Sequence, residues 1–443
     1  MKTPIYDYVK KYADSEPLRL HMPGHKGNSY LGVESLDVTE FDGADDLLSP
    51  NGIIGKSEQN ASKIFGANTF YSTEGSSLCI RAMVHLVLKF AKENGVKPLI
   101  LAGRNAHKSF LSAIALLDVD VDWLYGKDCS YLSCDIDARQ LREYLTNNKD
   151  LPVALYITSP DYLGNSVNIK SIAEVCKEFD ILLLVDNAHG AYLKFLPNSI
   201  HPIDLGATMC CDSAHKTLPA LTGASYLHIS KNAPAFFNDN VKTAMSLFAS
   251  SSPSYLILQS LDILNRYLYQ DYKQKLKDFI PLVNDLKLSL KRHGYTLIGN
   301  EPLKVCIQCS ALGYYGHELN QLLKANNIIC EFYDKDYIVF MFTPEIKPCE
   351  LIRLEKLLLS IERKNSLPLP PNPVKPKKAV NVRDAVFSAS EKIATKDAVG
   401  RVVSTISVSC PPAVPIIVSG EIIDESVIER LSYYGDDWVE VVK

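Results

Sequence analysis

The sequence has no long apolar run and no marked excess of charge of either sign. No stretch approaches the roughly 18 consecutive apolar residues of a membrane-spanning helix, and residues 1–8 lack the apolar core of a signal peptide. The formal net charge is −4 in a chain with 22% charged residues, which gives no basis for nucleic acid or an anionic membrane as a partner. We therefore expect a soluble globular protein.

The pattern of cysteines excludes a disulfide framework and gives no metal site. Eleven cysteines, an odd number, are scattered along the chain, which favours reduced thiols in a cytoplasmic protein. The single Cys-x-x-Cys pair, Cys306 and Cys309, lies in a strand-like apolar run without a second pair. A core strand is therefore favoured over a zinc or redox site, and no metal is predicted.

Apolar strands alternate with helical patterns from residue 57 to about residue 229. This alternation predicts an α/β fold with a mostly parallel sheet and helices on both faces. Ligands of such folds bind at the carboxyl ends of the strands, and most polar motifs of this chain follow predicted strands.

Two of these predicted strands lead to an acid and a lysine that could take part in catalysis. The apolar run 181–185 ends at Asp186, and the run 207–211 leads to Lys216, thirty positions after Asp186. An enzyme that uses pyridoxal 5'-phosphate (PLP) needs a lysine for the Schiff base and an acid that keeps the pyridine nitrogen protonated. A buried salt bridge between the two residues is the alternative explanation.

A phosphate site is suggested where Glu74 is followed by Gly75, Ser76 and Ser77 at the start of a predicted helix. Backbone N–H groups, hydroxyls and the positive end of a helix dipole together bind phosphate. A serine in this position often serves only as a helix cap, so the motif by itself is weak.

The motifs together resemble the signature series of the Orn/Lys/Arg decarboxylase family, which has the PLP-dependent aspartate-aminotransferase-type fold (fold type I). The similar segments follow one another in the family's order: 20–26, 39–40 with 45–47, 105–109, 158–160, 186–190, 213–222, and 411–415 with 420–421. The length of the chain and the sequence of residues 215–222 resemble those of the shorter Gram-positive arginine decarboxylase type.

On this basis the chain divides into six parts. We expect an N-terminal arm (1–55), a PLP-binding large domain (56–250), bridging helices (251–293), a small α/β domain (294–365), a Pro-rich linker (366–378) and a C-terminal domain (379–443).

The resemblance implies roles at the matching positions. Lys216 would form the Schiff base, Asp186 would bind the pyridinium nitrogen, and His107 would stack on the cofactor ring. His189 and His215 would lie beside the cofactor and tune it or handle a proton. The phosphate would be held by Gly75, Ser76, Ser77 and Ser213.

The substrate's distal cation requires a carboxylate once it is desolvated. Glu421 is the first candidate, and Asp45 and Asp46 are further ones. The resemblance also implies a homodimer with shared active sites, in which one of the serines 250–252 would reach the partner's phosphate.

Three departures from the family pattern stand out. Glu74 replaces the asparagine common before the phosphate-binding glycine, and Ala413 stands where a glycine is usual. The N-terminal "wing" domain of the long enterobacterial members is missing, so the assemblies built on it are not expected.

The resulting expectation is decarboxylation of a basic L-amino acid to its amine and CO2. Arginine, giving agmatine, is favoured by resemblance, while lysine and ornithine stay open. The alternatives are an aminotransferase or carbon–sulfur lyase on the same fold, and a non-catalytic dimer. The small domain has no motif-anchored arginine for a substrate carboxylate, which favours decarboxylation. The presence of Lys216, Asp186 and His107 together argues against a non-catalytic protein.

Overall fold

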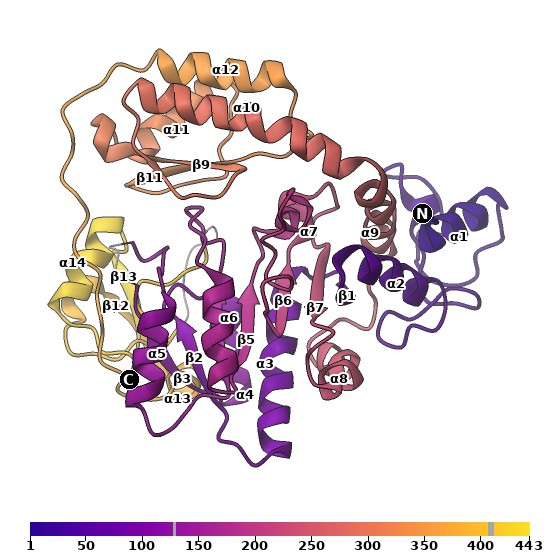
Figure 1. Cartoon of the computed structure of the whole chain (residues 1–443), viewed down its shortest axis with the longest axis horizontal. Coiled ribbons are helices and arrows are strands. Elements are labelled where there is room, and N and C mark those ends of the chain that lie inside the picture. Colours follow the sequence, from indigo (N-terminus) through magenta and orange to yellow (C-terminus); the bar gives the residue numbers. More distant parts are fainter. Residues whose placement is uncertain (127–129, 406–411) are drawn as a thin grey trace. The chain divides into compact units, whose positions relative to one another are not determined.

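A computed structural model describes residues 1–126, 130–405 and 412–443 of the chain. It contains two compact units, Met1–Lys97 with Ile169–Lys277 (unit 1) and Pro98–Asn168 with Asp278–Lys443 (unit 2). Strands β1 to β7 form one seven-stranded, mostly parallel sheet in the order β1-β7-β6-β5-β4-β2-β3 (Figure 1). The predicted fold class is confirmed.

Unit 1 contains the N-terminal helices and four strands of the sheet. Its elements are α1 (Pro4–Asp14), η1 (Glu34–Leu36), α2 (Ile53–Phe65), β1 (Asn68–Ser72), α3 (Gly75–Glu93), α6 (Ile169–Glu178), β5 (Leu182–Asp186), η2 (Ala191–Phe195), β6 (Met209–Asp212), α7 (Ala214–Thr217), β7 (Ser225–Ile229), α8 (Ala235–Ser246) and α9 (Tyr255–Tyr267). Strand β5 runs parallel to β6, whereas β7 pairs antiparallel with both β6 and β1.

Apolar composition and burial explain these strands. Four of the five residues of β5, and every residue of β6, are buried, as expected for strands covered on both faces. The long helix α3 packs against β1, β6 and β7 through an apolar face that runs from Leu78 to Ala91.

The predicted N-terminal arm begins with helix α1, which is fixed to the body of unit 1. Ile5 and Val9 are fully buried, and the carboxylate of Asp262 on α9 accepts the N–H groups of Ile5 (2.8 Å) and Tyr6 (3.0 Å). The same carboxylate accepts the hydroxyl of Ser57 on α2 at 2.5 Å. A buried acid therefore joins α1, α2 and α9.

Unit 2 contains the other three strands of the large sheet and two smaller sheets. Its elements are β2 (Leu99–Gly103), α4 (Lys108–Leu117), β3 (Asp120–Leu124), α5 (Ala138–Asn147), β4 (Ala154–Thr158), β8 (Leu297–Ile298), β9 (Lys304–Gln308), η4 (Cys309–Leu312), α11 (Gly316–Ala325), β10 (Phe332–Tyr333), β11 (Tyr337–Met341), α12 (Pro348–Leu359), α13 (Val382–Phe387), β12 (Ser390–Ala394), η5 (Thr395–Asp397), α14 (Glu425–Tyr434) and β13 (Trp438–Val442). The segment 251–293, predicted as bridging helices, contains α9, a π-helical turn (Leu268–Tyr272) and α10 (Lys273–Arg292).

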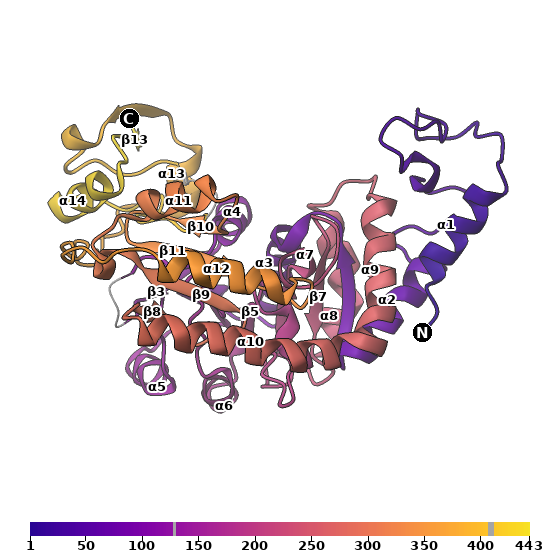
Figure 2. The same cartoon turned by 90° about the horizontal axis from the view of Figure 1, so that it is seen from above.

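Strands β2, β3 and β4 of unit 2 are parallel, and α4 and α5 lie on opposite sides of β3 (Figure 2). The antiparallel sheet β10-β11-β9-β8 is covered on one face by α10, α11 and α12 (Figure 1). The antiparallel strand pair β12–β13 packs with α14 around a small core that includes Val427, Leu431 and Val441.

The Cys-x-x-Cys pair lies in the core of unit 2, as the sequence predicts. Cys306 is in β9, Cys309 begins the next 3-10 turn, and both side chains are fully buried free thiols. Among the helices in the described ranges, none combines the length and the apolar composition needed to cross a membrane.

The cap of α14 gives a pH-dependent prediction. Asp424 accepts the Ser426 hydroxyl (2.6 Å) and the Val427 N–H (3.0 Å), and these bonds hold the pKa of Asp424 below its usual range. Asp424→Ala should lower the free energy of unfolding by about 1 kcal/mol at neutral pH. Because the folded pKa is depressed, this contribution exists above the unfolded value of about 4 and disappears as pH falls through the folded value.

Thermal unfolding of unmodified protein, Asp424→Ala and Asp424→Asn across acidic pH checks this prediction. Asp424→Asn retains a capping side chain without a titrating group, so its stability difference from the unmodified protein should shrink in acid. Equal melting temperatures of unmodified protein and Asp424→Ala at neutral pH would contradict the assigned cap.

Candidate active site

A lysine–histidine pair lies at the carboxyl end of β6 in unit 1. Lys216 is in the short helix α7 that follows β6, and its Nζ is 2.9 Å from Nε2 of His189. His189 is buried and Lys216 is half-buried. The structure thus brings together two of the predicted catalytic residues, in an arrangement through which a proton can pass between amine and imidazole.

Asp186 is the last residue of β5 and is buried, with 3% of its surface exposed. The register of the parallel strands places Asp186 opposite Cys211 of β6, and Asp186 Oδ1 accepts the N–H of Ala188 at 3.2 Å. The acid and the Lys216–His189 pair therefore lie at the carboxyl ends of neighbouring strands.

The predicted phosphate site is partly assembled in unit 1. The hydroxyl of Ser213 donates to Ser76 Oγ at 3.0 Å, which joins the end of β6 to the start of α3. Gly75 has φ +71°, and a Cβ built there would meet no atom within 4 Å. Ser77 follows in the first turn of the 19-residue helix α3. An open backbone at the positive end of a long helix suits an anion.

The departure at Glu74 has a structural explanation. Glu74 is the N-cap residue of α3, but its side chain makes no capping hydrogen bond. Instead Oε1 accepts the N–H of Ser250 at 2.6 Å. The carboxylate therefore holds the loop at residue 250, which carries the serines predicted to reach a partner's phosphate.

His215 lies beside Lys216 in α7 and is half-buried. Its Nδ1 is 2.8 Å from the carbonyl oxygen of Ala224, so this nitrogen carries the proton and donates. Burial lowers the pKa of His215, and the neighbouring Lys216 charge acts in the same direction. The hydrogen bond to Ala224 fixes the orientation of the imidazole.

The two acidic candidates of the arm make mainly local contacts. The Asp45 carboxylate accepts the N–H groups of Asn51, Gly52, Ile54 and Gly55 at 2.8–3.2 Å. Asp46 Oδ1 accepts the N–H of Leu48 at 2.8 Å. Asp45 thus binds the amino-terminal turn of α2, a structural task that sequence spacing does not reveal.

His107 belongs to unit 2, where it follows β2 as the N-cap of α4. Its Nδ1 accepts the N–H of Ser109 at 3.1 Å, which fixes the ring at the beginning of the helix. The next residue, Lys108, donates its backbone N–H to the carbonyl of Ala413 at 2.8 Å. Unit 2 therefore joins the His107 turn to the C-terminal motif; Pro411, the first residue of that motif, lies outside the described residues.

Glu421 is buried in unit 2 and forms an ion pair that the sequence analysis missed. Its Oε2 accepts Nη2 of Arg104 at 2.9 Å and the N–H of Val418 at 2.7 Å. Burial raises the pKa of Glu421, although the Arg104 guanidinium opposes this shift. Arg104 directly precedes the motif 105–109, but no local signal connects it with residue 421.

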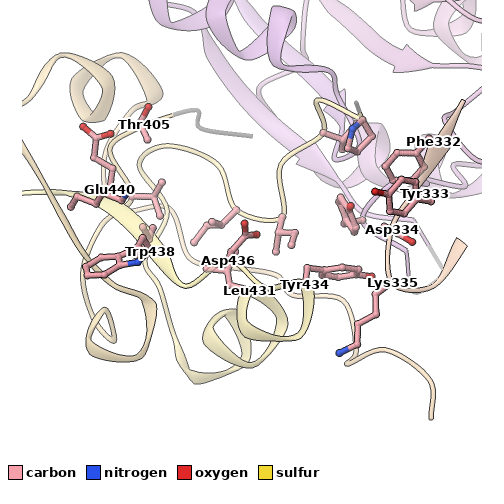
Figure 3. Close-up of a pocket in the computed structure, with 18 residues that line it drawn as sticks. Phe332, Tyr333, Asp334, Lys335, Thr405, Leu431, Tyr434, Asp436, Trp438 and Glu440 are labelled. Atoms are coloured by element: carbon pink, nitrogen blue, oxygen red, sulfur yellow. The ribbon is translucent and has the colours of Figure 1, made fainter. Parts of the chain in front are cut away.

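A separate cavity of about 500 Å³ lies in unit 2 between the β10–β11 turn and the strand pair β12–β13 (Figure 3). Its lining includes Asp334, Tyr434, Asp436 and Trp438. None of the predicted site residues lines this cavity.

A second feature missed by the sequence analysis is a buried cluster on β6. His201, Cys210 and Asp212 are fully buried and have possible ligand atoms within 4.8 Å of one another. The carboxylate of Asp212 already accepts N–H groups from His201, His228 and Asn187. Hydrogen bonds therefore account for the contact between His201 and Asp212.

Comparison with known proteins defines the class and then the family. The Francisella novicida lysine decarboxylase LdcF superposes with a TM-score of 0.81 at 17% identity, covering 100% of this chain and 81% of that structure. The fold is accordingly that of the fold type I PLP-dependent enzymes. The family model "Orn/Lys/Arg decarboxylase, major domain" matches residues 3–306, and the chain belongs to this PLP-dependent family.

Two relatives from Bacillus subtilis (strain 168) match nearly the whole chain. One is an arginine decarboxylase, 31% identical over 98% of this chain and 93% of the relative. The other is the uncharacterized protein YaaO, 29% identical over 98% of this chain and 94% of the relative. The resemblance stated from the motifs is thereby confirmed at the level of the family.

The serine pair gives a prediction about cofactor binding. Ser213→Ala removes the donor to Ser76, and the loss of about 1–1.5 kcal/mol should weaken PLP binding roughly tenfold. PLP titration followed by protein fluorescence measures the change. Ser246→Ala is the control, because this exposed serine of α8 bonds only its own helix at Thr243. Equal affinities of Ser213→Ala and the control would argue against a phosphate at this position.

Proposed function

We propose that the protein removes the α-carboxylate of L-arginine as CO2 and releases agmatine, using PLP. The observation that carries the proposal is the Lys216–His189 contact beside Asp186 at the ends of two parallel strands. Lysine and ornithine present the same α-amino acid with a different tail, and they are the alternative substrates.

The residues of unit 1 fit the cofactor. A phosphate has a place at the start of α3, where Gly75 leaves open space and the hydroxyls of Ser76 and Ser213 meet. A primary amine, Lys216, is available for the aldehyde, and the buried carboxylate of Asp186 suits a pyridinium nitrogen. In unit 2 we assign His107 to the ring face, since α4 fixes its imidazole.

Bound PLP supplies an electron sink for the electrons left when CO2 departs. The buried carboxylate of Asp186 would face the pyridine nitrogen and favour its protonated form. Lys216 would hold the cofactor through its amine. When CO2 leaves, Cα must gain one proton, and we assign this transfer to Lys216 Nζ with His189 Nε2 as its proton partner.

The choice of arginine rests on the relatives. The Bacillus subtilis relative with 31% identity over nearly the full chain is named arginine decarboxylase, and relatives of the same name from Halalkalibacterium halodurans and Bacillus anthracis are 29% and 28% identical. For the distal cation we propose Glu421. Its buried carboxylate is paired with the guanidinium of Arg104, so the guanidinium of the substrate would have to share or replace this partner.

We further propose that the chain acts as a homodimer with shared active sites. Five large apolar side chains of the arm are mostly exposed: Leu18 and Leu20 (84% each), Met22 (67%), Tyr30 (79%) and Leu31 (86%). Such a concentration within fourteen residues is typical of a surface that a partner covers.

Product identification tests the substrate proposal. Purified protein loaded with PLP is incubated in turn with L-arginine, L-lysine and L-ornithine, and the amines are identified by mass spectrometry. We expect agmatine from arginine at a kcat/KM at least tenfold above the values for the other two. Predominant formation of cadaverine or putrescine would show that lysine or ornithine, not arginine, is the substrate. Transamination without release of CO2 would show that the reaction is not a decarboxylation.

Removal of the charge at position 186 tests the assigned chemistry. Asp186→Asn should retain PLP but lower kcat at least about 100-fold, equivalent to about 3 kcal/mol of activation free energy, because the electron sink is lost. Lys216→Ala, measured beside it, should lose the visible absorbance of bound PLP after dialysis. Near-normal turnover of Asp186→Asn would show that another group protonates the cofactor.

A further inference from the structure

The carboxylate of Asp212 has three hydrogen-bond donors in a fully buried position. Its Oδ2 accepts Nε2–H of His201 at 3.0 Å and of His228 at 3.1 Å, and Oδ1 accepts the amide of Asn187 at 2.6 Å. All four side chains have 0% of their surface exposed. A buried carboxylate with this many donors is stabilised in its charged form.

The electrostatics of the cluster agree with this geometry. Burial alone would raise the pKa of Asp212, but His201 and His228 hold the pKa of its carboxyl well below the usual range. Burial lowers the pKa of His228, whose Nδ1 lies 2.9 Å from the hydroxyl of Thr69. The carboxylate of Asp212 therefore provides a fixed negative charge and two fixed acceptor oxygens at the end of β6.

Asn187 connects this cluster to the active-site turn. Its N–H donates to the carbonyl of Cys211 at 3.0 Å, and its own carbonyl accepts the N–H of Gly190 at 2.8 Å. Asn187 Oδ1 is buried without a partner, and a Cβ on Gly190 would lie only 2.1 Å from it. The side chain of Asn187 thus fits tightly under the turn 187–190, and the bond to Asp212 offsets the cost of its unpaired oxygen.

His189 lies inside this turn, with Nε2 2.9 Å from Lys216 Nζ. Lys216 itself follows Asp212 by four residues, at the end of the one-turn helix α7. Asp212 is therefore connected to both residues of the pair. It is connected to His189 by its hydrogen bond to Asn187, and to Lys216 by the four-residue step along the backbone.

We propose that Asp212 is a positioning residue, whose buried carboxylate holds Asn187 and thereby sets His189 against Lys216. The inference rests on the proposed role of Lys216 in binding PLP. It assigns a task to Asp212, Asn187, His201 and His228, none of which was among the candidate site residues.

The experiment compares Asp212→Asn with a matched variant, Asp262→Asn. Asp262 is also a fully buried carboxylate of unit 1 with three donors, but these come from Ile5, Tyr6 and Ser57. Both variants lose a buried charge, and we expect both to lower the melting temperature. Only Asp212→Asn should disturb the turn, because an amide cannot accept from all three donors that face position 212.

Two measurements independent of turnover report on the turn. Hydrogen exchange of the full chain without cofactor should be at least tenfold faster at the amides of Asn187 and Gly190 in Asp212→Asn and unchanged in Asp262→Asn. PLP titration should show at least tenfold weaker binding in Asp212→Asn only. Unchanged exchange and PLP affinity in Asp212→Asn would overturn the proposal and leave Asp212 a purely stabilising residue.

A second variant tests the connection through Asn187. It also keeps the proposal testable if Asp212→Asn does not fold. Asn187→Ala leaves His201, Asp212 and His228 together and should reproduce the faster exchange and the weaker PLP binding. The double variant should be no worse than Asp212→Asn, since both changes break one contact. Additive effects would overturn the assigned path, as would a stoichiometric metal in the purified protein that Asp212→Asn loses.

These outcomes are distinguishable from failure of the proposed function. If the unmodified protein decarboxylates no basic amino acid, the substrate assignment fails, while exchange and PLP binding still decide the role of Asp212. If decarboxylation is confirmed and Asp212→Asn behaves like Asp262→Asn, only the positioning role is lost.

Discussion

The register between β5 and β6 is the constraint on which the active site depends. Because these strands are parallel and pair Asp186 with Cys211, the segments that follow β5 and β6 leave the sheet at the same edge. A shift of one residue would turn every side chain of a strand to the opposite face. It would remove Asp186 from the buried position it occupies and separate Asn187 from Asp212. The pairing that builds the sheet therefore also sets the positions of Asp186 and Asn187.

Buried charge at this edge carries a cost that the fold meets with hydrogen-bond donors. Desolvating a carboxylate is unfavourable by several kcal/mol unless hydrogen bonds or opposite charge replace water. Around Asp212, two imidazoles and an amide do so, and each donor comes from a different segment of unit 1. The network therefore also joins segments that are distant in sequence, which makes its geometry resistant to local rearrangement.

Much of this arrangement could be predicted from local sequence signals. The apolar run before Asp186, the glycine and serines before a helical pattern and the polar motif at Lys216 each identified a strand end, and the observed strands β5 and β6 end within one residue of the predicted positions. Such signals succeed because strand burial and helix capping are determined by neighbouring residues. The comparisons confirm the family and the fold, while the roles of individual residues stay predictions.

The features that escaped prediction depend on contacts between distant segments. His201 and His228 carry no motif, and their relation to Asp212 appears only when β6, β7 and the loop before β6 are packed together. The pairing of Arg104 with Glu421 joins residues separated by 317 positions. Asp45 lies in a family motif, and its role as a substrate ligand stays a prediction. Sequence spacing did not reveal that its carboxylate accepts backbone N–H groups six to ten residues further along the chain.

The departure at Ala413 shows how a motif can survive loss of its usual residue. Ala413 has φ +58°, the left-handed conformation that glycine adopts without penalty and that costs other residues about 1–2 kcal/mol. Its carbonyl accepts the N–H of Lys108, one of the donors at the start of α4 that no helical carbonyl can satisfy. The next residue, Val414, packs in a core cluster with Leu163 and Phe332. These two interactions hold the left-handed turn in place, so the backbone geometry expected of glycine is kept by an alanine whose strain its neighbours offset.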